Sequence, residues 1–176
     1  MSTSKFEFAA IVELLRRSEN DTQVRTFFGQ AMLRIEHDEY YGSLEFKSEG
    51  VEVVFNEAPW VVRPDEVAEP KELYVAAFHL HREGHEGYAG YSGQLPNGVA
   101  LDDPEGEVLR KMGSSPHSRG GGGMSTLLKR PIPYWFRYAL GDGFLHFQLD
   151  ATRRIQMVTL EASDVVGGRV PAVSHR

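Results

Sequence analysis

Three histidines lie close together in the sequence and have the residue type that binds metal ions. His79 and His81 are one residue apart in an apolar stretch, and His85 follows after three more residues. Alternate residues of a β-strand point to the same face, so the first two imidazoles would be neighbours. With the third from the following turn, they would form a zinc site that leaves one position open for water.

The same three residues also fit a solvated strand end that runs into a glycine-rich turn. No acidic partner that would orient the imidazoles can be assigned from the sequence. We therefore predict no metal and no cofactor. A small metal-dependent enzyme that uses His79, His81 and His85 is kept as an alternative.

Other motifs give no catalytic pattern. The run Gly120 to Gly123 lacks the Gly-Lys-Ser/Thr step of a phosphate loop, because Lys129 comes too late. Ser125 has no strand-turn-helix context that would make it a nucleophile. The chain has no cysteine, which excludes disulfides, thiol catalysis and cysteine-bound zinc. These absences predict a protein that is not an enzyme.

Acidic residues are concentrated in one segment of the chain. Between Glu36 and Glu72 there are eleven acidic and three basic residues, a local charge of −8 against −6 for the whole chain. Tyr40, Tyr41 and Trp60 lie in this segment, and aromatic residues surrounded by charge are typical of interfaces. The alternative is that Trp60 and one tyrosine fill a core. We predict the following partner-binding residues: Glu39, Tyr40, Tyr41, Glu57, Trp60, Asp65, Glu66 and Glu69.

Hydrophobic periodicity predicts short helices and antiparallel strands that would position these residues. Helices are expected over 5–17 and 21–28, the latter with a capping box from Asn20 and Gln23, and from Asp103, as the cap, to Met112, with stops at Gly29 and Gly113. Strands are expected over 32–36, 43–47, 51–55, 73–81, 134–139, 144–149 and 155–160, with a flexible linker around Gly120 to Gly123.

The two halves of the sequence follow the same order of short helix, glycine stop, loop and antiparallel strands. The fold prediction is therefore α+β, with two tandem units of short helices packed on an antiparallel sheet. The units span 1–85 and 86–176, or form one continuous domain. No leader and no apolar run of membrane-spanning length is seen, so a cytoplasmic protein without membrane contact is expected. The acidic charge argues against direct binding of nucleic acid.

One stretch of the sequence resembles a known group of proteins. It contains Tyr91-Ser92-Gly93-Gln94-Leu95-Pro96-Asn97-Gly98, then Val108 to Gly113, Gly141-Asp142-Gly143 and His146. Residues 91–160 resemble small bacterial immunity-like proteins, and half of the tandem fold of the beta-lactamase inhibitor protein and of small outer-membrane assembly lipoproteins. A lipoprotein's cysteine is missing.

The resemblance implies a protein-binding fold. The predicted function is an immunity protein that binds and occludes a cognate toxin with a basic surface, for example a nuclease. A structural homo-oligomer is a further alternative to the metal-dependent enzyme.

Overall fold

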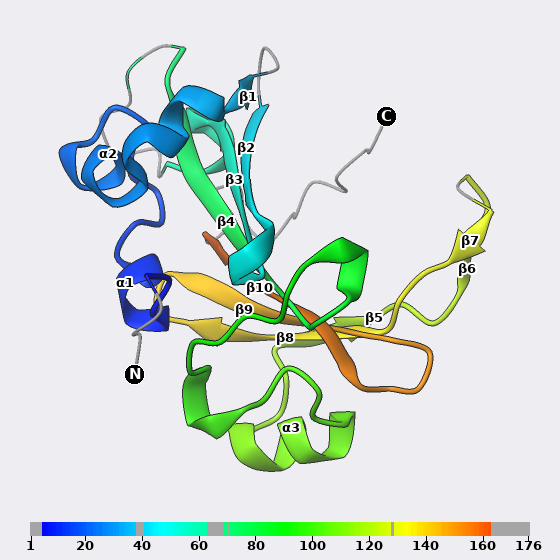
Figure 1. The fold of residues 1–176 in the computed structure, drawn as a ribbon. Helices are drawn as coiled ribbons and strands as arrows, with labels where there is room; N and C mark the ends of the chain where they lie inside the picture. Colours follow the sequence, from blue (N-terminus) through cyan, green and yellow to red (C-terminus); the bar gives the residue numbers. More distant parts are fainter. Residues whose placement is uncertain (1–4, 38–40, 63–68, 70, 128, 163–176) are drawn as a thin grey trace.

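The protein is built on one antiparallel β-sheet, which twists strongly from one edge to the other (Figure 1). The computed structural model describes residues 5–37, 41–62, 69, 71–127 and 129–162. Within these residues the sheet has eight strands in the order β1-β2-β3-β4-β10-β9-β8-β5. Their bounds are β1 Glu36–His37, β2 Tyr41–Phe46, β3 Val51–Glu57, β4 Leu73–His81, β5 Ser118–Gly120, β8 Trp135–Leu140, β9 Gly143–Leu149 and β10 Ile155–Ala162.

The two halves of the chain meet in the middle of this sheet, where β4 pairs with β10. His79 lies opposite Thr159 there, although 80 residues separate them. On one side β2, β3 and β4 form an antiparallel meander, and on the other side β8, β9 and β10 do the same. A short strand, β1 or β5, closes each edge. The α+β class is confirmed, and the boundary at residue 85 stays a prediction.

The α-helices of the described chain contribute to one apolar core on a single face of the sheet. They are α1 Phe8–Val12, α2 Thr22–Phe28 and α3 Glu105–Met112. Their buried residues, among them Ile11, Val24 and Val108, join buried residues of the strands, such as Phe55 and Phe147. Full burial of such side chains contributes about 1.5–3 kcal/mol each. No helix among the described residues is long and apolar enough to cross a membrane.

The opposite side of the sheet is called the outer face here, because the strand residues that alternate with the core residues point to it. Short 3-10 helices fill several connections between strands and helices. They are η1 Gly29–Arg34, η2 Lys47–Glu49, η3 Ala58–Trp60, η4 His85–Gly87 and η5 Pro96–Gly98.

The first helix is shorter than its amphipathic pattern predicts. Instead of continuing to residue 17, α1 ends at Val12 and the chain turns toward β4. The backbone N–H of Arg16 donates to the Val75 carbonyl at 2.8 Å, and Val75 donates back to Arg17 at 2.9 Å. These long-range hydrogen bonds replace the last helical turn.

The second helix begins as predicted but is capped by a different residue. The carboxylate of Asp21 accepts from the backbone N–H of Gln23 at 2.7 Å and of Val24 at 3.4 Å. Asn20, the expected cap, instead donates from its side chain to Glu72 at 2.9 Å. The helix stop at Gly29 is confirmed, with φ of 56°.

One strand prediction and one loop prediction need correction. A strand was expected over 32–36, but the chain continues after Gly29 as the 3-10 helix η1, and only Glu36 and His37 pair with β2. The expected linker contains β5 and a ribbon of β6 Met124–Ser125 and β7 Arg130–Pro131, which extends away from the sheet (Figure 1). Gly121 has φ of 80°, and a Cβ there would overlap the Pro133 carbonyl oxygen.

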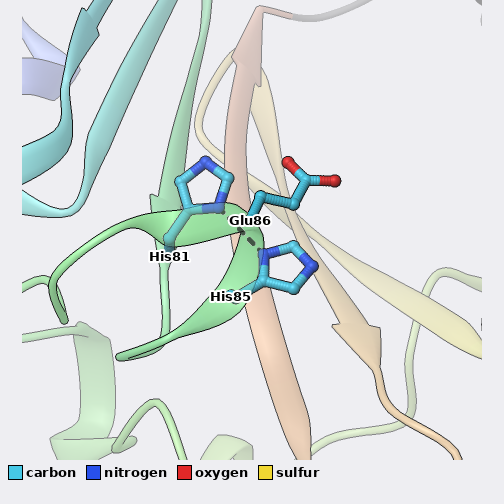
Figure 2. Close-up of side chains that lie close together, drawn as sticks. All are labelled: His81, His85 and Glu86. Carbon is cyan, nitrogen blue, oxygen red and sulfur yellow. Dashed lines mark hydrogen bonds between the residues drawn. The ribbon is translucent and has the colours of Figure 1, made fainter.

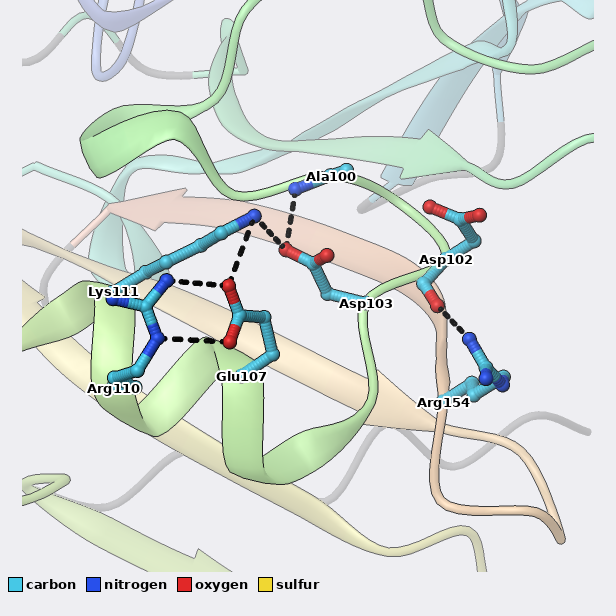
Figure 3. A network of polar contacts seen from close by, with 7 residues as sticks. All are labelled: Ala100, Asp102, Asp103, Glu107, Arg110, Lys111 and Arg154. Atoms are coloured by element: carbon cyan, nitrogen blue, oxygen red, sulfur yellow. Dashed lines mark hydrogen bonds and ion pairs between the residues drawn. The ribbon is translucent and has the colours of Figure 1, made fainter.

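A polar network holds α3 against the loop that precedes it (Figure 3). Asp103 does not cap the helix as predicted. Its carboxylate accepts from the Ala100 N–H at 2.8 Å and pairs with Lys111 Nζ at 2.7 Å. Arg154, in the β9–β10 turn, donates to the Asp102 carbonyl at 2.8 Å. These contacts are internal to the fold, and we assign them a structural role. Gly113 ends the helix in the left-handed conformation, as predicted.

Candidate functional site

A row of polar side chains crosses the outer face of the sheet. Residues directly opposite each other in antiparallel strands lie on the same face, close enough to interact. The strand registers align seven residues in this way, so that polar and ionisable groups extend from β2 to β5. In spatial order the row is Glu45, Glu52, His79, Thr159, His146, Arg137 and Ser118.

The residues in the middle of this row and at its β5 end form hydrogen bonds and an ion pair with neighbouring strands. The Nδ1 atom of His79 lies 2.8 Å from the Thr159 hydroxyl. Arg137 donates from Nε to the Ser118 hydroxyl at 2.8 Å and pairs with Glu161 at 3.6 Å. Burial, together with the nearby guanidinium of Arg137, lowers the pKa of His146 to about 4, so this ring is neutral at pH 7.

The β2 end of the row is acidic and electrostatically unfavourable. Glu45 and Glu52 are direct cross-strand neighbours, and like charges in that position destabilise a sheet. Burial, together with the carboxylates of Glu45 and Glu86, raises the pKa of Glu52 to about 7 against the opposing effect of Lys47. The protein therefore keeps three carboxylates together at a cost to its own stability. Such a cost is typical of a functional site.

Two aromatic residues in or next to the β2–β3 hairpin lie outside the core. Tyr41 follows the same alternation as Glu45 and is 38% exposed. Burial and the charges of Glu52 and Glu45 raise its pKa, while a hydrogen bond with Ser43 lowers it. Trp60 is 49% exposed in η3, just after β3, and its indole N–H donates to a Glu57 carboxylate oxygen at 3.1 Å. For both residues the alternative of a core position is wrong.

The other predicted partner-binding residues are placed only in part. Glu57 is half-buried at the end of β3, and Glu69 is exposed. The backbone N–H of Glu69 donates to the hydroxyl of Tyr74, whose ring packs with Val61 and Val62. Glu39, Tyr40, Asp65 and Glu66 lie outside the described residues. Of the predicted residues, the structure describes Tyr41, Glu57 and Trp60 in or next to the β2–β3 hairpin. We group them with Glu45 and Glu52 of the same hairpin, which the sequence analysis did not select, and call these five residues the acidic surface.

The three-histidine cluster of the metal-enzyme alternative does not form, although His81 and His85 meet. The Nδ1 atoms of His81 and His85 are 2.9 Å apart (Figure 2). The ring of His79 lies 6.5 Å from that of His81, and its Nδ1 atom is hydrogen-bonded to Thr159. Glu86 takes the third place: its carboxylate and the two imidazoles offer ligand atoms within 4.8 Å of one another. Sequence reasoning missed Glu86, because the neighbour of a turn histidine has no periodic signal.

Burial also tunes this cluster. The His81 side chain is fully buried, and its ring stacks on Tyr88 with centroids 3.8 Å apart and planes within 3°. Burial and the neighbouring His85 lower the pKa of His81 to about 4, against the charge of Glu45. Burial lowers the pKa of His85 too. The His81 ring is therefore neutral at pH 7.

A second exposed surface, missed by the sequence analysis, lies on the β6–β7 ribbon. Met124, Leu127, Ile132 and Tyr134 are exposed there, and the Arg153 guanidinium lies 3.7 Å from the Tyr134 ring centroid. The signal in the sequence was the presence of large apolar residues in a segment that was predicted to be a flexible linker. The glycine run itself leads into the ribbon without a following helix, so it does not form a phosphate loop.

Comparison with protein families, curated proteins and solved structures gives no match to this chain. The resemblance of residues 91–160 to immunity-like proteins stays a prediction.

Proposed function

We propose that this protein is an immunity protein that binds and blocks a cognate bacterial toxin through the acidic surface. The main support is the pairing of Glu45 with Glu52 in the β2–β3 hairpin, together with the exposed rings of Tyr41 in β2 and of Trp60, which follows β3. Folding alone favours neither feature, because the carboxylates repel each other and the aromatic surface stays in water. A partner with positive charge would remove both costs.

The partner that fits this surface is a protein with a basic cleft. A nuclease toxin is the leading case, because its active site must attract phosphate. Negative charge on the inhibitor would accelerate encounter, and buried aromatic anchors would slow release. The bound inhibitor would then occlude the cleft. This role requires no catalysis and no direct contact with nucleic acid, and it places the protein in the cytoplasm, where such a toxin acts.

We also propose that the protein consists of two tandem units of one helix-and-sheet fold. The strand order has the same pattern on both sides of the β4–β10 junction, and a helix with a glycine stop precedes each meander. Duplication of one unit about an axis at that junction would produce this order. The pseudo-repeat would also explain how a small unit forms a sheet wide enough to bind a protein.

A homo-oligomer formed through the sheet edges is less well supported. Within the part of the chain that the structure describes, the edge strands β1 and β5 are two and three residues long. Short edge strands offer few unpaired backbone groups to another chain, and natural proteins use them to avoid edge-to-edge pairing.

The proposal is tested with a toxin domain encoded beside this gene, by co-expression and by measuring binding rates. Trp60→Ala should raise the dissociation rate about 30-fold, as expected for an anchor worth about 2 kcal/mol. Tyr134→Ala is the matched control, because that ring is also exposed but lies at the other end of the sheet. It should bind normally and protect cells.

Charge is tested separately. The double variant Glu45→Lys with Glu69→Lys should slow association about tenfold and flatten its dependence on salt. Asp102→Lys, an exposed acid beside α3, should leave the rates unchanged. Equal loss in the Tyr134 or Asp102 variants, or normal binding by both the Trp60 variant and the Glu45/Glu69 double variant, would show that the partner binds elsewhere. Failure to protect cells from any neighbouring toxin would refute the immunity role.

A further inference from the structure

The connection after β4 contains two imidazoles and a carboxylate that are not part of the acidic surface. His81 is the last residue of β4, and His85 and Glu86 lie in η4 (Figure 2). The Nδ1 atoms of the two imidazoles face each other at 2.9 Å, and the three residues offer ligand atoms within 4.8 Å of one another. Tetrahedral coordination of Zn²⁺ by two imidazoles and a carboxylate places the ligand atoms about 3.3 Å apart.

We propose that His81, His85 and Glu86 bind a divalent transition-metal ion such as Zn²⁺. The ion lies between the two Nδ1 atoms, and the proton of the hydrogen-bonded pair moves to the Nε2 atom of the ring that donated it, so that both imidazoles bind as neutral ligands. The imidazole nitrogens need to separate by only a few tenths of an ångström, and the exposed Glu86 carboxylate needs to move closer by rotation of its side chain. A set of two nitrogens and one carboxylate oxygen suits zinc and its neighbours rather than magnesium or calcium.

The backbone positions these ligands in advance. The His81 ring is held by stacking on Tyr88. Gly84 and Gly87 have φ of 80°, and Glu86 itself has φ of 51°, an uncommon conformation for a residue with a side chain. Hydrogen bonds from Gly84 N–H to the Tyr88 carbonyl at 2.9 Å and from Tyr88 N–H to the His85 carbonyl at 3.0 Å close the turn. The turn therefore presents His85 and Glu86 to the end of β4.

The charges around the site also favour a cation. Glu86 and Glu45 both act electrostatically on Glu52, and Glu45 acts on His81. A bound divalent ion would offset the repulsion among these carboxylates. It would also fasten the connection between the two halves of the chain to the sheet. Water or a partner side chain would complete the coordination.

The test is Zn²⁺ titration of the full chain after treatment with EDTA, followed by calorimetry and by thermal melting. The parent protein should bind one ion per chain, and its melting midpoint should rise with Zn²⁺. His85→Ala and Glu86→Gln should each weaken binding at least tenfold and lose the rise in midpoint. Both residues are outside the core, so these variants should fold.

His79→Ala is the discriminating control and should bind Zn²⁺ like the parent. Loss of binding in that variant would overturn the assignment of Glu86 in favour of a three-histidine site. Absence of binding by the parent, or equal binding by His85→Ala, would show that the two imidazoles form only a hydrogen-bonded pair. Toxin binding measured in EDTA tests the proposed function independently, so the failure of either proposal leaves the other open.

Discussion

Replacing Glu52 with glutamine should stabilise the protein at alkaline pH and have little effect at acidic pH. The pKa of this carboxyl is raised from 4.5 to about 7 by burial and by Glu45 and Glu86, against the effect of Lys47. The folded protein therefore holds this proton up to a higher pH than the unfolded chain does. The free energy of unfolding consequently falls as pH rises from about 4.5 to about 7, and the loss is complete above that range.

The size of the effect follows from the difference in pKa. The full pKa difference corresponds to about 3 kcal/mol in the free energy of unfolding. We expect roughly half of this, about 1.5 kcal/mol, because Glu52 keeps contact with water and solvent screens the charges of its neighbours. Glu52→Gln removes the charge and keeps the shape of the side chain. The variant should therefore be about 1.5 kcal/mol more stable than the parent at pH 8 and nearly equal to it at pH 5.

Urea unfolding followed by tryptophan fluorescence at pH 5, 7 and 8 measures this difference. EDTA in the buffer keeps metal ions from contributing. Glu83→Gln, at an exposed position of the same connection, is the matched control and should show no pH-dependent gain. Equal stability differences at pH 5 and pH 8, or destabilisation at pH 8, would refute the idea that the acidic surface carries an electrostatic cost.

Two further predictions concern the fold around the site. Asp150 accepts hydrogen bonds from Arg82 and from the β9–β10 turn, and these bonds lower its pKa despite the opposing effect of burial. Asp150→Asn should therefore lower the free energy of unfolding by about 2 kcal/mol at pH 7, measured by urea unfolding. The difference between variant and parent should shrink as pH falls below about 4. Gly50 and Gly84 both have positive φ, but a Cβ on Gly50 would overlap the Ala89 carbonyl, whereas nothing lies within 4 Å of one on Gly84. Gly84→Ala should therefore cost about 1 kcal/mol and Gly50→Ala at least twice as much in the same assay, and equal costs would contradict the close packing of the β2–β3 hairpin on the connection.

Local patterns determined most of the strands. Leu73 to His81 forms β4 with the predicted bounds, and the predicted strands of the second half differ from β8, β9 and β10 by two residues at most. Alternating apolar residues are sufficient for this, because one face of each strand must enter the core. The helix stops at Gly29 and Gly113 were equally local, since glycine adopts positive φ without steric cost.

Only the tertiary structure decided which polar groups meet. Asp21 rather than Asn20 caps α2, because the Asn20 side chain donates a hydrogen bond to Glu72, the residue that directly precedes β4. Glu86 rather than His79 joins His81 and His85, because Thr159 of β10 engages His79. The polar row itself depends on the β4–β10 pairing and on the exact registers of seven strands. A register is fixed by the packing of distant segments into one core, and no single segment of the sequence contains that information.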